Sequence, residues 1–160
     1  MIAEQIKDVK KFMSKLLIDN SFDNFLVNEV SITTYNTFEI DGHIKKEFYT
    51  DEEFSSLPDS HLSCWSKIRP FCFSLIKGNK TPVKFRMIFA LNRAEMENLI
   101  TSNHISINMN DVNELFLNIK YENGTLTYVT GTSLKIFTMD KSLEKAFDTY
   151  ISNFISTLFY

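Results

Sequence analysis

The feature that most constrains the fold of this chain is a short internal echo. The segment Val27–Ile32, read VNEVSI, returns as Val112–Leu117, read VNELFL, and each copy follows an amphipathic, helix-like stretch at a similar spacing. Two copies of one small α/β unit would constrain the architecture more firmly than any single motif. A three-residue identity also arises by chance in a chain of 160 residues. The weight of the echo therefore depends on the order of the elements around each copy.

The residues up to Tyr49 predict a strand, a helix and three further strands. Apolar residues recur at the i, i+3, i+4, i+7 spacing of an amphipathic helix, and Asp41-Gly42 is typical of a tight hairpin. The expected elements are a strand over 2–6, a helix over 8–18, and strands over 26–35, 37–40 and 43–49, the last being the return strand of that hairpin.

The middle of the chain predicts helices. Thr50 and Glu53 have the spacing of a capping box for a short helix, which Pro58 would end. A longer helix is expected over 60–77, where Pro70 should kink or divide it near Arg69. The segment 78–82 then reads as a connector.

The second half repeats the order of the first. Asn92 and Glu95 are placed to cap a helix, Glu122-Asn123-Gly124 lies between two alternating segments, and Gly131 is expected to interrupt the sheet. The expected elements are a strand over 83–91, a helix over 93–102, strands over 115–121, 125–130 and 133–137, and a final helix that Asp140 caps.

These elements predict an α+β fold of two βαβββ-like repeats in one domain over 1–160. The internal halves are approximately 1–50 and 82–138, joined by a connecting helical segment over 51–81 that supplies an inserted central helix, and followed by a C-terminal helix over 140–158. The sequence leaves open whether the halves are a true duplication.

Five runs spread over nearly the whole chain point to one family. They are Asp8–Met13, Thr37–Gly42, Arg69–Gly78, Leu115–Ile119 and Thr130–Phe137. In these runs the chain resembles a family of small, uncharacterised bacterial proteins known only as a domain of unknown function. The resemblance implies no activity.

The order of elements is also similar, more weakly, to DNA sliding-clamp (processivity) domains. Those domains are built from paired βαβββ units whose helices line the DNA and whose sheets lie outside. The resemblance implies a clamp-like fold, but the sequence contains no diagnostic clamp motif, and a fold does not determine a function.

A stripe of lysines follows one face of the first predicted helix. Such a stripe could neutralise phosphates and would then bind nucleic acid in a salt-dependent way. Lysines on the solvated side of an amphipathic helix are also ordinary, and the third predicted helix places Glu95 and Glu97 beside Arg93. The candidate nucleic-acid-binding residues are Lys7, Lys10, Lys11 and Lys15.

No catalytic residue, metal site or cofactor is predicted. His61 and Cys64 are three residues apart, but Cys72 is two helical turns further on and no fourth ligand for a structural zinc is near. No Gly-x-Ser-x-Gly elbow, P-loop or Gly-x-Gly-x-x-Gly motif is present. On one helix the two cysteines would be about 12 Å apart, beyond the reach of a disulfide. We expect both to be reduced thiols.

The densest aromatic cluster surrounds Pro70 and consists of Trp65, Phe71 and Phe73. These side chains either fill the space between the halves, as aromatic residues on helices usually do, or form a binding surface for a peptide. The last residues, Leu158–Tyr160, predict either docking onto the core or a self-association surface.

Composition limits the classes of function. A net charge of −3 gives no whole-molecule attraction to nucleic acid or an anionic membrane. No apolar run approaches the length of a membrane span, and the first residues lack a signal-peptide pattern, so we expect a cytoplasmic location. The favoured function is a non-catalytic binding or assembly module with an unknown protein partner or self-association. The alternatives are a clamp-like nucleic-acid-associated protein and a small enzyme of unrecognised class.

Overall fold

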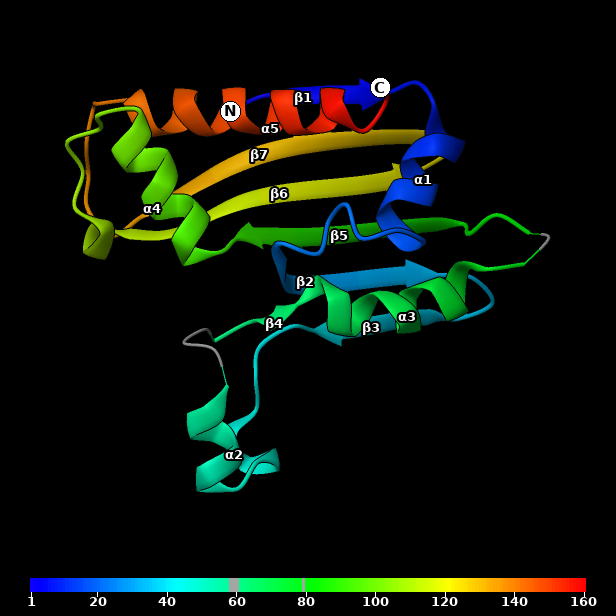
Figure 1. Ribbon diagram of the computed structural model, residues 1–160. Helices are drawn as coiled ribbons and strands as arrows, with labels where there is room; N and C mark the ends of the chain where they lie inside the picture. The colour runs from blue at the N-terminus through cyan, green and yellow to red at the C-terminus, as the bar shows by residue number, and fades with distance from the viewer. Residues whose placement is uncertain (58–60, 79) are drawn as a thin grey trace.

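The computed structural model describes residues 1–57, 61–78 and 80–160. They form an α+β fold in which a seven-stranded antiparallel sheet carries α1, α3, α4 and α5 on one face (Figure 1). The elements are β1 (Ala3–Ile6), α1 (Val9–Leu17), β2 (Phe25–Thr33), β3 (Thr37–Asp41), α2 (Asp51–Ser56), β4 (Ser63–Cys64), α3 (Trp65–Ile76), β5 (Lys84–Leu91), α4 (Arg93–Ser102), β6 (Val112–Glu122), β7 (Thr125–Leu134) and α5 (Ser142–Thr157), with short 3-10 helices at Lys46–Phe48 and Met109–Asp111.

The strand order in the sheet is β1-β7-β6-β5-β2-β3, and the two-residue β4 pairs with β2. Strand β5 shows why the sheet has a covered and an open face. Its residues Phe85, Met87 and Phe89 are buried under the helices, while the intervening Lys84 and Arg86 are exposed. The predicted α+β class and the alternating strands are therefore confirmed.

The predicted helix starts are also confirmed where a side chain caps the backbone. Asp8 accepts a hydrogen bond from the backbone N–H of Lys11 at 3.1 Å, and Asn92 accepts one from Glu95 at 2.8 Å. Thr50 and Glu53 form the complete capping box that begins α2. Each cap satisfies N–H groups that have no partner inside the helix.

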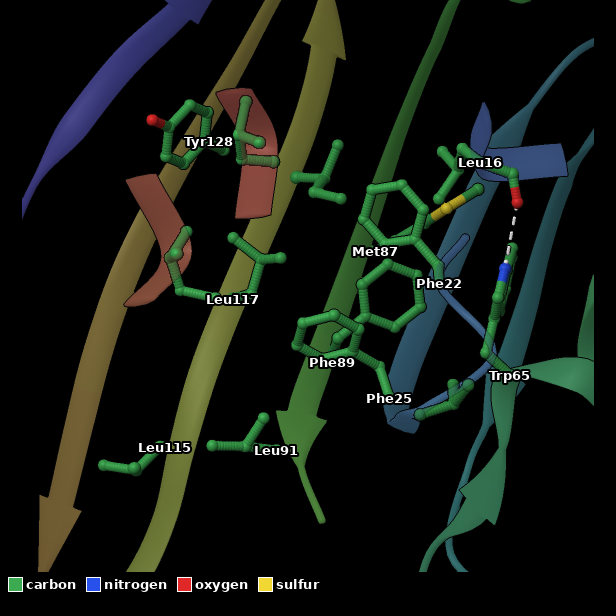
Figure 2. Close-up of a cluster of buried hydrophobic side chains, with 14 of the residues drawn as sticks. Leu16, Phe22, Phe25, Trp65, Met87, Phe89, Leu91, Leu115, Leu117 and Tyr128 are labelled. Atoms are coloured by element: carbon green, nitrogen blue, oxygen red, sulfur yellow. Dashed lines mark hydrogen bonds between the residues drawn. The ribbon is translucent and has the colours of Figure 1, made fainter. Parts of the chain in front are cut away.

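The core lies between the sheet and the four helices on that face. Figure 2 shows Trp65 of α3 pointing toward Leu16 of α1, with aromatic side chains from the segment after α1 and from β5 beside them. The indole Nε1–H of Trp65 donates to the backbone oxygen of Leu16 at 3.0 Å, and its ring meets Phe89 edge-on with 4.9 Å between centroids. Trp65 therefore ties α3 to both α1 and the sheet.

The expected return strand over 43–49 is wrong. Strand β3 instead pairs with β2 around the turn at 34–36, and His43 makes only an isolated bridge to Leu62. Gly42 is required for close packing and not for a turn, because a Cβ atom there would lie 1.7 Å from the backbone oxygen of Val27.

The separate strand expected over 133–137 is also wrong. Gly131 does not interrupt the sheet: it pairs with Phe116, and β7 continues to Leu134. The turn glycine of this hairpin is Gly124, which follows Asn123, and both residues have the positive φ of a type I′ turn.

Each half therefore has the order β-α-β-β in the described part of the chain, one strand fewer than the βαβββ unit expected. The halves also differ in place, because β1 lies at an edge beside β7, whereas β5 lies between β2 and β6. The repeat and the clamp-like architecture are not confirmed.

The echo nevertheless marks a shared local structure. The pairing register shifts between Val27 and Glu29 in β2 and between Val112 and Glu114 in β6, so each Val-Asn-Glu run forms a β-bulge at its asparagine. The two bulges face different neighbours, β5 for the first and β7 for the second. The identity reflects similar local geometry.

The long helix expected over 60–77 is shorter than predicted. It begins at Trp65, because Ser63 and Cys64 pair with β2 as β4, and it continues through Pro70 without division. Pro70 is the sixth residue of α3, so only the single hydrogen bond that its missing N–H would make is lost. Pro58, Ser60 and Asn79, which entered the predicted helix ends and connector, lie outside the described residues.

The C-terminal helix docks onto the core. Leu143, Phe147, Ile151 and Ile155 of α5 are buried, as is Leu158 just after it, while Tyr160 is exposed. The N-cap position is Lys141 and not Asp140, although Asp140 accepts hydrogen bonds from the backbone N–H and hydroxyl of Ser142. Within the described chain, no helix combines the length and apolar character that crossing a bilayer requires.

Candidate functional site

The lysine stripe predicted for nucleic acid is divided by contacts within the chain. The ammonium group of Lys11 donates to the backbone oxygen of Phe159 at 3.2 Å and lies over its ring, and Lys15 pairs with Asp19 at 3.2 Å. Lys7 and Lys10 are exposed. Half of the stripe therefore contacts the protein itself.

The predicted aromatic cluster is divided as well. Trp65 is fully buried, whereas Phe71 and Phe73 are 66% and 38% exposed. Two residues apart on a helix, Phe71 and Phe73 point about 200° apart, so they do not form one surface. Trp65 belongs to the core, as the first alternative for this cluster expected.

One residue from each predicted set meets at a groove between α1 and α3. Lys10 of α1 and Phe73 of α3 both line this groove, which has a volume of about 410 Å³ and whose walls are largely apolar. The sequence placed these two residues in separate candidate sites, and only the packing of α1 against α3 brings them together. We call this site the groove.

A larger cavity lies at the other end of α3. Its volume is about 720 Å³, within the range of small-molecule sites. Its walls include the start of α3, the start of α4 and the inserted segment between β3 and β4, which contributes Ile44, Tyr49 and Leu57. Residues around the starts of β2 and β6 complete the lining. Figure 1 shows α2, within that inserted segment, standing apart from the sheet. We call this site the cavity.

The cavity contains a largely buried carboxylate. The side chain of Glu114 is only 13% exposed and pairs with Nε2 of His61 at 2.9 Å. Burial raises the pKa of Glu114, and the neighbouring His61, Arg93 and His43 oppose that rise. The second residue of the pair, His61, lies beside His43, with 5.9 Å between ring centroids.

His43 is in turn held by the carboxylate of Asp41. The Nδ1 atom of His43 lies 2.6 Å from Asp41 Oδ1, and Lys45 lies 2.6 Å from Oδ2. Lys45, and then His43, hold the pKa of Asp41 well below its usual range. A line of ionisable groups thus runs from the exposed Asp41 through two imidazoles to the buried Glu114.

A second carboxylate in the cavity has one unused oxygen. Asp23 pairs with Arg69 through Oδ2 at 3.3 Å, while its Oδ1 is buried and accepts no hydrogen bond from any group that the structure describes. The side-chain amide of Asn92 donates to the backbone oxygen of Asn24 at 2.8 Å. This bond holds together the chain neighbours of the two asparagines, Asp23 and Arg93. A buried unsatisfied acceptor of this kind is costly without a partner.

Two cations of the cavity are free of close partners. Lys67 and Arg93 are exposed, and neither side chain makes a hydrogen bond or a close ion pair with residues 1–57, 61–78 or 80–160. Both lie in the first turn of a helix, α3 and α4 respectively. A cation there is disfavoured by the helix dipole, whose N-terminal end is positive.

The cysteines have different environments. Cys64 is half-buried and lines the cavity, whereas Cys72 is buried in α3, and burial raises the pKa of its thiol to about 12. In the described residues no hydrogen bond joins Cys64 to His61, so they do not form a nucleophile–base pair. Nor does that portion contain a group of three or more His, Cys, Asp or Glu side chains suited to hold a metal.

Sequence reasoning missed the main residues of the cavity. Glu114 was only the third residue of the echo, and Asp23, Lys67 and Arg93 belong to no motif. The one usable signal was the second Val-Asn-Glu run, because the β-bulge that it forms lies at the start of β6, beside the cavity.

Comparison with known proteins identifies a family. The model of a family described as "Family of unknown function (DUF5721)" matches residues 15–158. No curated protein and no solved structure matches the chain. The likeness to sliding clamps is therefore not confirmed by any relative.

Proposed function

We propose that this chain, which belongs to DUF5721, a family of unknown function, is a non-catalytic binding module that holds a small amphipathic acid in the cavity. The observation that carries the proposal is the balance of charge there. Each described carboxylate of the cavity already has a close cationic or imidazole partner, Asp23 with Arg69 and Glu114 with His61. Lys67 and Arg93 make no hydrogen bond or close ion pair with the described residues, and Arg93 acts on Glu114 only at longer range.

The ligand follows from this balance. An anionic group of the ligand would neutralise Lys67 and Arg93 and would offset the cost of a cation at the start of a helix. Buried apolar side chains from Leu26, Leu62 and Met96 would receive an apolar body. A hydroxyl or amine on the ligand would satisfy Asp23 Oδ1.

Cys64 provides a readout specific to the cavity, because it lines the cavity and not the groove. The test measures the rate at which iodoacetamide alkylates Cys64, by mass spectrometry, with and without 4-hydroxyphenylacetate. This probe combines an acid, an aromatic body and a hydroxyl donor. We expect it to slow alkylation in the wild-type protein and to lose that effect in the double variant K67Q/R93Q.

Two related probes separate the contributions. Phenylacetate keeps the acid without the donor and should protect less; 2-(4-hydroxyphenyl)ethanol keeps the donor without the acid and should protect least. Equal protection by the acid and the alcohol would contradict the proposed role of the cations. No protection by the acid at millimolar concentration, the weak end of specific binding, would contradict the site itself.

Nucleic-acid binding through the first helix is the weaker proposal, because Lys11 and Lys15 contact the protein itself. It predicts retention of the protein on duplex DNA at low salt that is lost in the variant K7E/K10E. Retention that does not depend on these lysines would remove this alternative.

A cytoplasmic location is also part of the proposal. Two free cysteines, one of them half-buried, suit a compartment that keeps thiols reduced. Fractionation of the cells that produce the protein, with thiol labelling, would test it; recovery of the native protein with Cys64 in a mixed disulfide would contradict it.

A further inference from the structure

The groove between α1 and α3 is separate from the cavity and has a different character. Its floor is formed by Phe85 of β5 and Tyr121 of β6, whose rings are stacked with centroids 5.5 Å apart. Val9 and Met13 of α1 line one wall, and Phe73 and Ile76 of α3 line the other. Both pairs have the one-turn spacing that forms an apolar ridge on a helix.

All the formal charges that line the groove are positive. They belong to Lys10, Lys77 and Lys80, which are exposed and make no hydrogen bond or ion pair through their side chains with the described residues. Lys10 lies on the α1 wall, and the other two follow the α3 wall. The net charge of the protein is −3, so an apolar groove whose charged residues, among those described, are all lysines is a local exception.

The distribution of these charges indicates the shape of a partner. An amphipathic helix presents an apolar stripe with polar residues on both flanks, and such helices bind lengthwise in hydrophobic grooves. Lysines on both walls of an apolar groove match acidic residues on both flanks of such a stripe. A single anionic headgroup would be matched by the lysines of only one wall.

We infer that the groove is a docking site for an acidic amphipathic helix of a partner protein. The partner's apolar side chains lie over Phe85, Tyr121 and Phe73, and its carboxylates pair with Lys10, Lys77 and Lys80. Phe73 is open to the partner, since it is 38% exposed before binding. This inference does not depend on the ligand proposed for the cavity.

The test uses a synthetic peptide of roughly 16 residues, long enough to form a helix in water. Its leucines follow the i, i+3, i+4, i+7 spacing and its flanks carry glutamates. Fluorescence anisotropy measures its binding to the whole protein. We expect the charge-reversal variant K10E/K77E/K80E to weaken binding at least about tenfold, and we expect a peptide with lysines in place of the glutamates not to bind the wild type.

Neighbouring phenylalanines of α3 provide a matched pair. Phe73→Ser should weaken binding because Phe73 lines the groove, whereas Phe71→Ser should leave it unchanged because Phe71 is exposed and does not line it. Both residues are exposed, so both variants should fold, which thermal unfolding would check. Equal loss in the two variants would overturn the inference.

Dodecanoate tests the alternative that the groove binds a single-chain anionic amphiphile instead of a helix. Displacement of the bound peptide by an unrelated peptide of equal charge, or binding of dodecanoate at the groove without binding of the acidic helix, would overturn the inference. Binding of the acidic helix that survives K67Q/R93Q and is lost in K10E/K77E/K80E would support it and would assign it to the groove.

Discussion

The cavity and the groove lie at opposite ends of α3 and differ in how they treat charge. In the cavity, partly buried carboxylates are paired with other side chains of the protein, Glu114 with His61 and Asp23 with Arg69. Among the described residues that line the groove there is no carboxylate, its interior is apolar, and its lysines are exposed. Burying a charge is costly unless the charge is paired, whereas an exposed lysine keeps its hydration. The cavity is therefore suited to a small ligand that completes an existing polar network, and the groove to a surface that brings its own charges.

The largest effect should come from Trp65, the residue that holds both sites in place from the middle of the core. Trp65→Ala should lower the free energy of unfolding by about 3–5 kcal/mol, the usual cost of removing a large buried aromatic side chain. It should weaken binding at the cavity and at the groove together, because α3 contributes to both. Urea unfolding followed by circular dichroism measures the change.

Trp65→Phe is the control for that variant. It retains an aromatic ring beside Phe89 and loses the hydrogen bond to Leu16, so it should cost much less, with about 1 kcal/mol for the hydrogen bond. If the two variants were equally destabilised, the hydrogen bond and not the packing would be the main contribution of Trp65.

Gly42→Ala should affect the cavity and spare the groove. A Cβ atom at Gly42 would lie 1.7 Å from the backbone oxygen of Val27, and Gly42 links the β2 bulge to Ser63 through backbone hydrogen bonds of 2.9 and 2.8 Å. Forcing these backbones apart should cost about 1–3 kcal/mol or more and should change the alkylation rate of Cys64.

Gly131→Ala is the matched control, because its added Cβ would meet only Phe116 Cβ at an ordinary 3.8 Å. It should leave stability and the alkylation of Cys64 nearly unchanged. If G42A weakened binding of the acidic helix at the groove as much as binding of the probe at the cavity, the two sites would not be independent.

A smaller, pH-dependent effect is expected at Glu114. Because burial raises the pKa of Glu114 in the folded state, the folded protein binds more protons than the unfolded chain. Its stability therefore falls as pH rises from the ordinary pKa of 4.5 through the raised value. Glu114→Gln lacks this loss, so its stability relative to the wild type should increase toward neutral pH in thermal unfolding.

Glu122 gives the opposite sign on an exposed strand end. Lys120 lowers the pKa of Glu122, so this residue contributes stability that is lost as pH falls. Glu122→Gln should therefore lose a little stability at neutral pH and none well below the folded pKa of Glu122. The two variants showing the same pH trend would contradict the burial argument for Glu114.

The smallest effect concerns reactivity alone. In the native protein, iodoacetamide should modify Cys64 and leave Cys72 unmodified, because Cys72 is buried and burial raises the pKa of its thiol to about 12. Peptide mapping by mass spectrometry distinguishes the two thiols. Modification of Cys72 at the rate of Cys64 without denaturant would show that α3 opens on the timescale of labelling.

The predictions from sequence succeeded where the determining contacts are local. The α1 apolar spacing, the caps at Thr50 and Asn92, and the turn at Asn123-Gly124 all depend on residues a few positions apart. The predictions failed at Gly42 and Gly131, which were both expected to mark turns or breaks. Gly42 instead packs closely against the backbone of Val27, and Gly131 pairs with Phe116 within the sheet. A glycine's role there depends on what lies opposite it, which is far away in the sequence.

By itself, the sequence determined the amphipathic helix α1, the hairpin at Asn123-Gly124 and the alternation that buries one face of strands such as β5, because these arise from periodicity and nearby hydrogen bonds. Only the tertiary structure decided that β1 pairs with β7, that Lys10 and Phe73 line one groove, and that Glu114 lies beside His61. The members of these pairs are far apart in the sequence: His61 and Glu114 are 53 positions apart, and Ala3 and Val129 are 126 positions apart. These contacts are set by how the layers pack, and no local pattern specifies that packing.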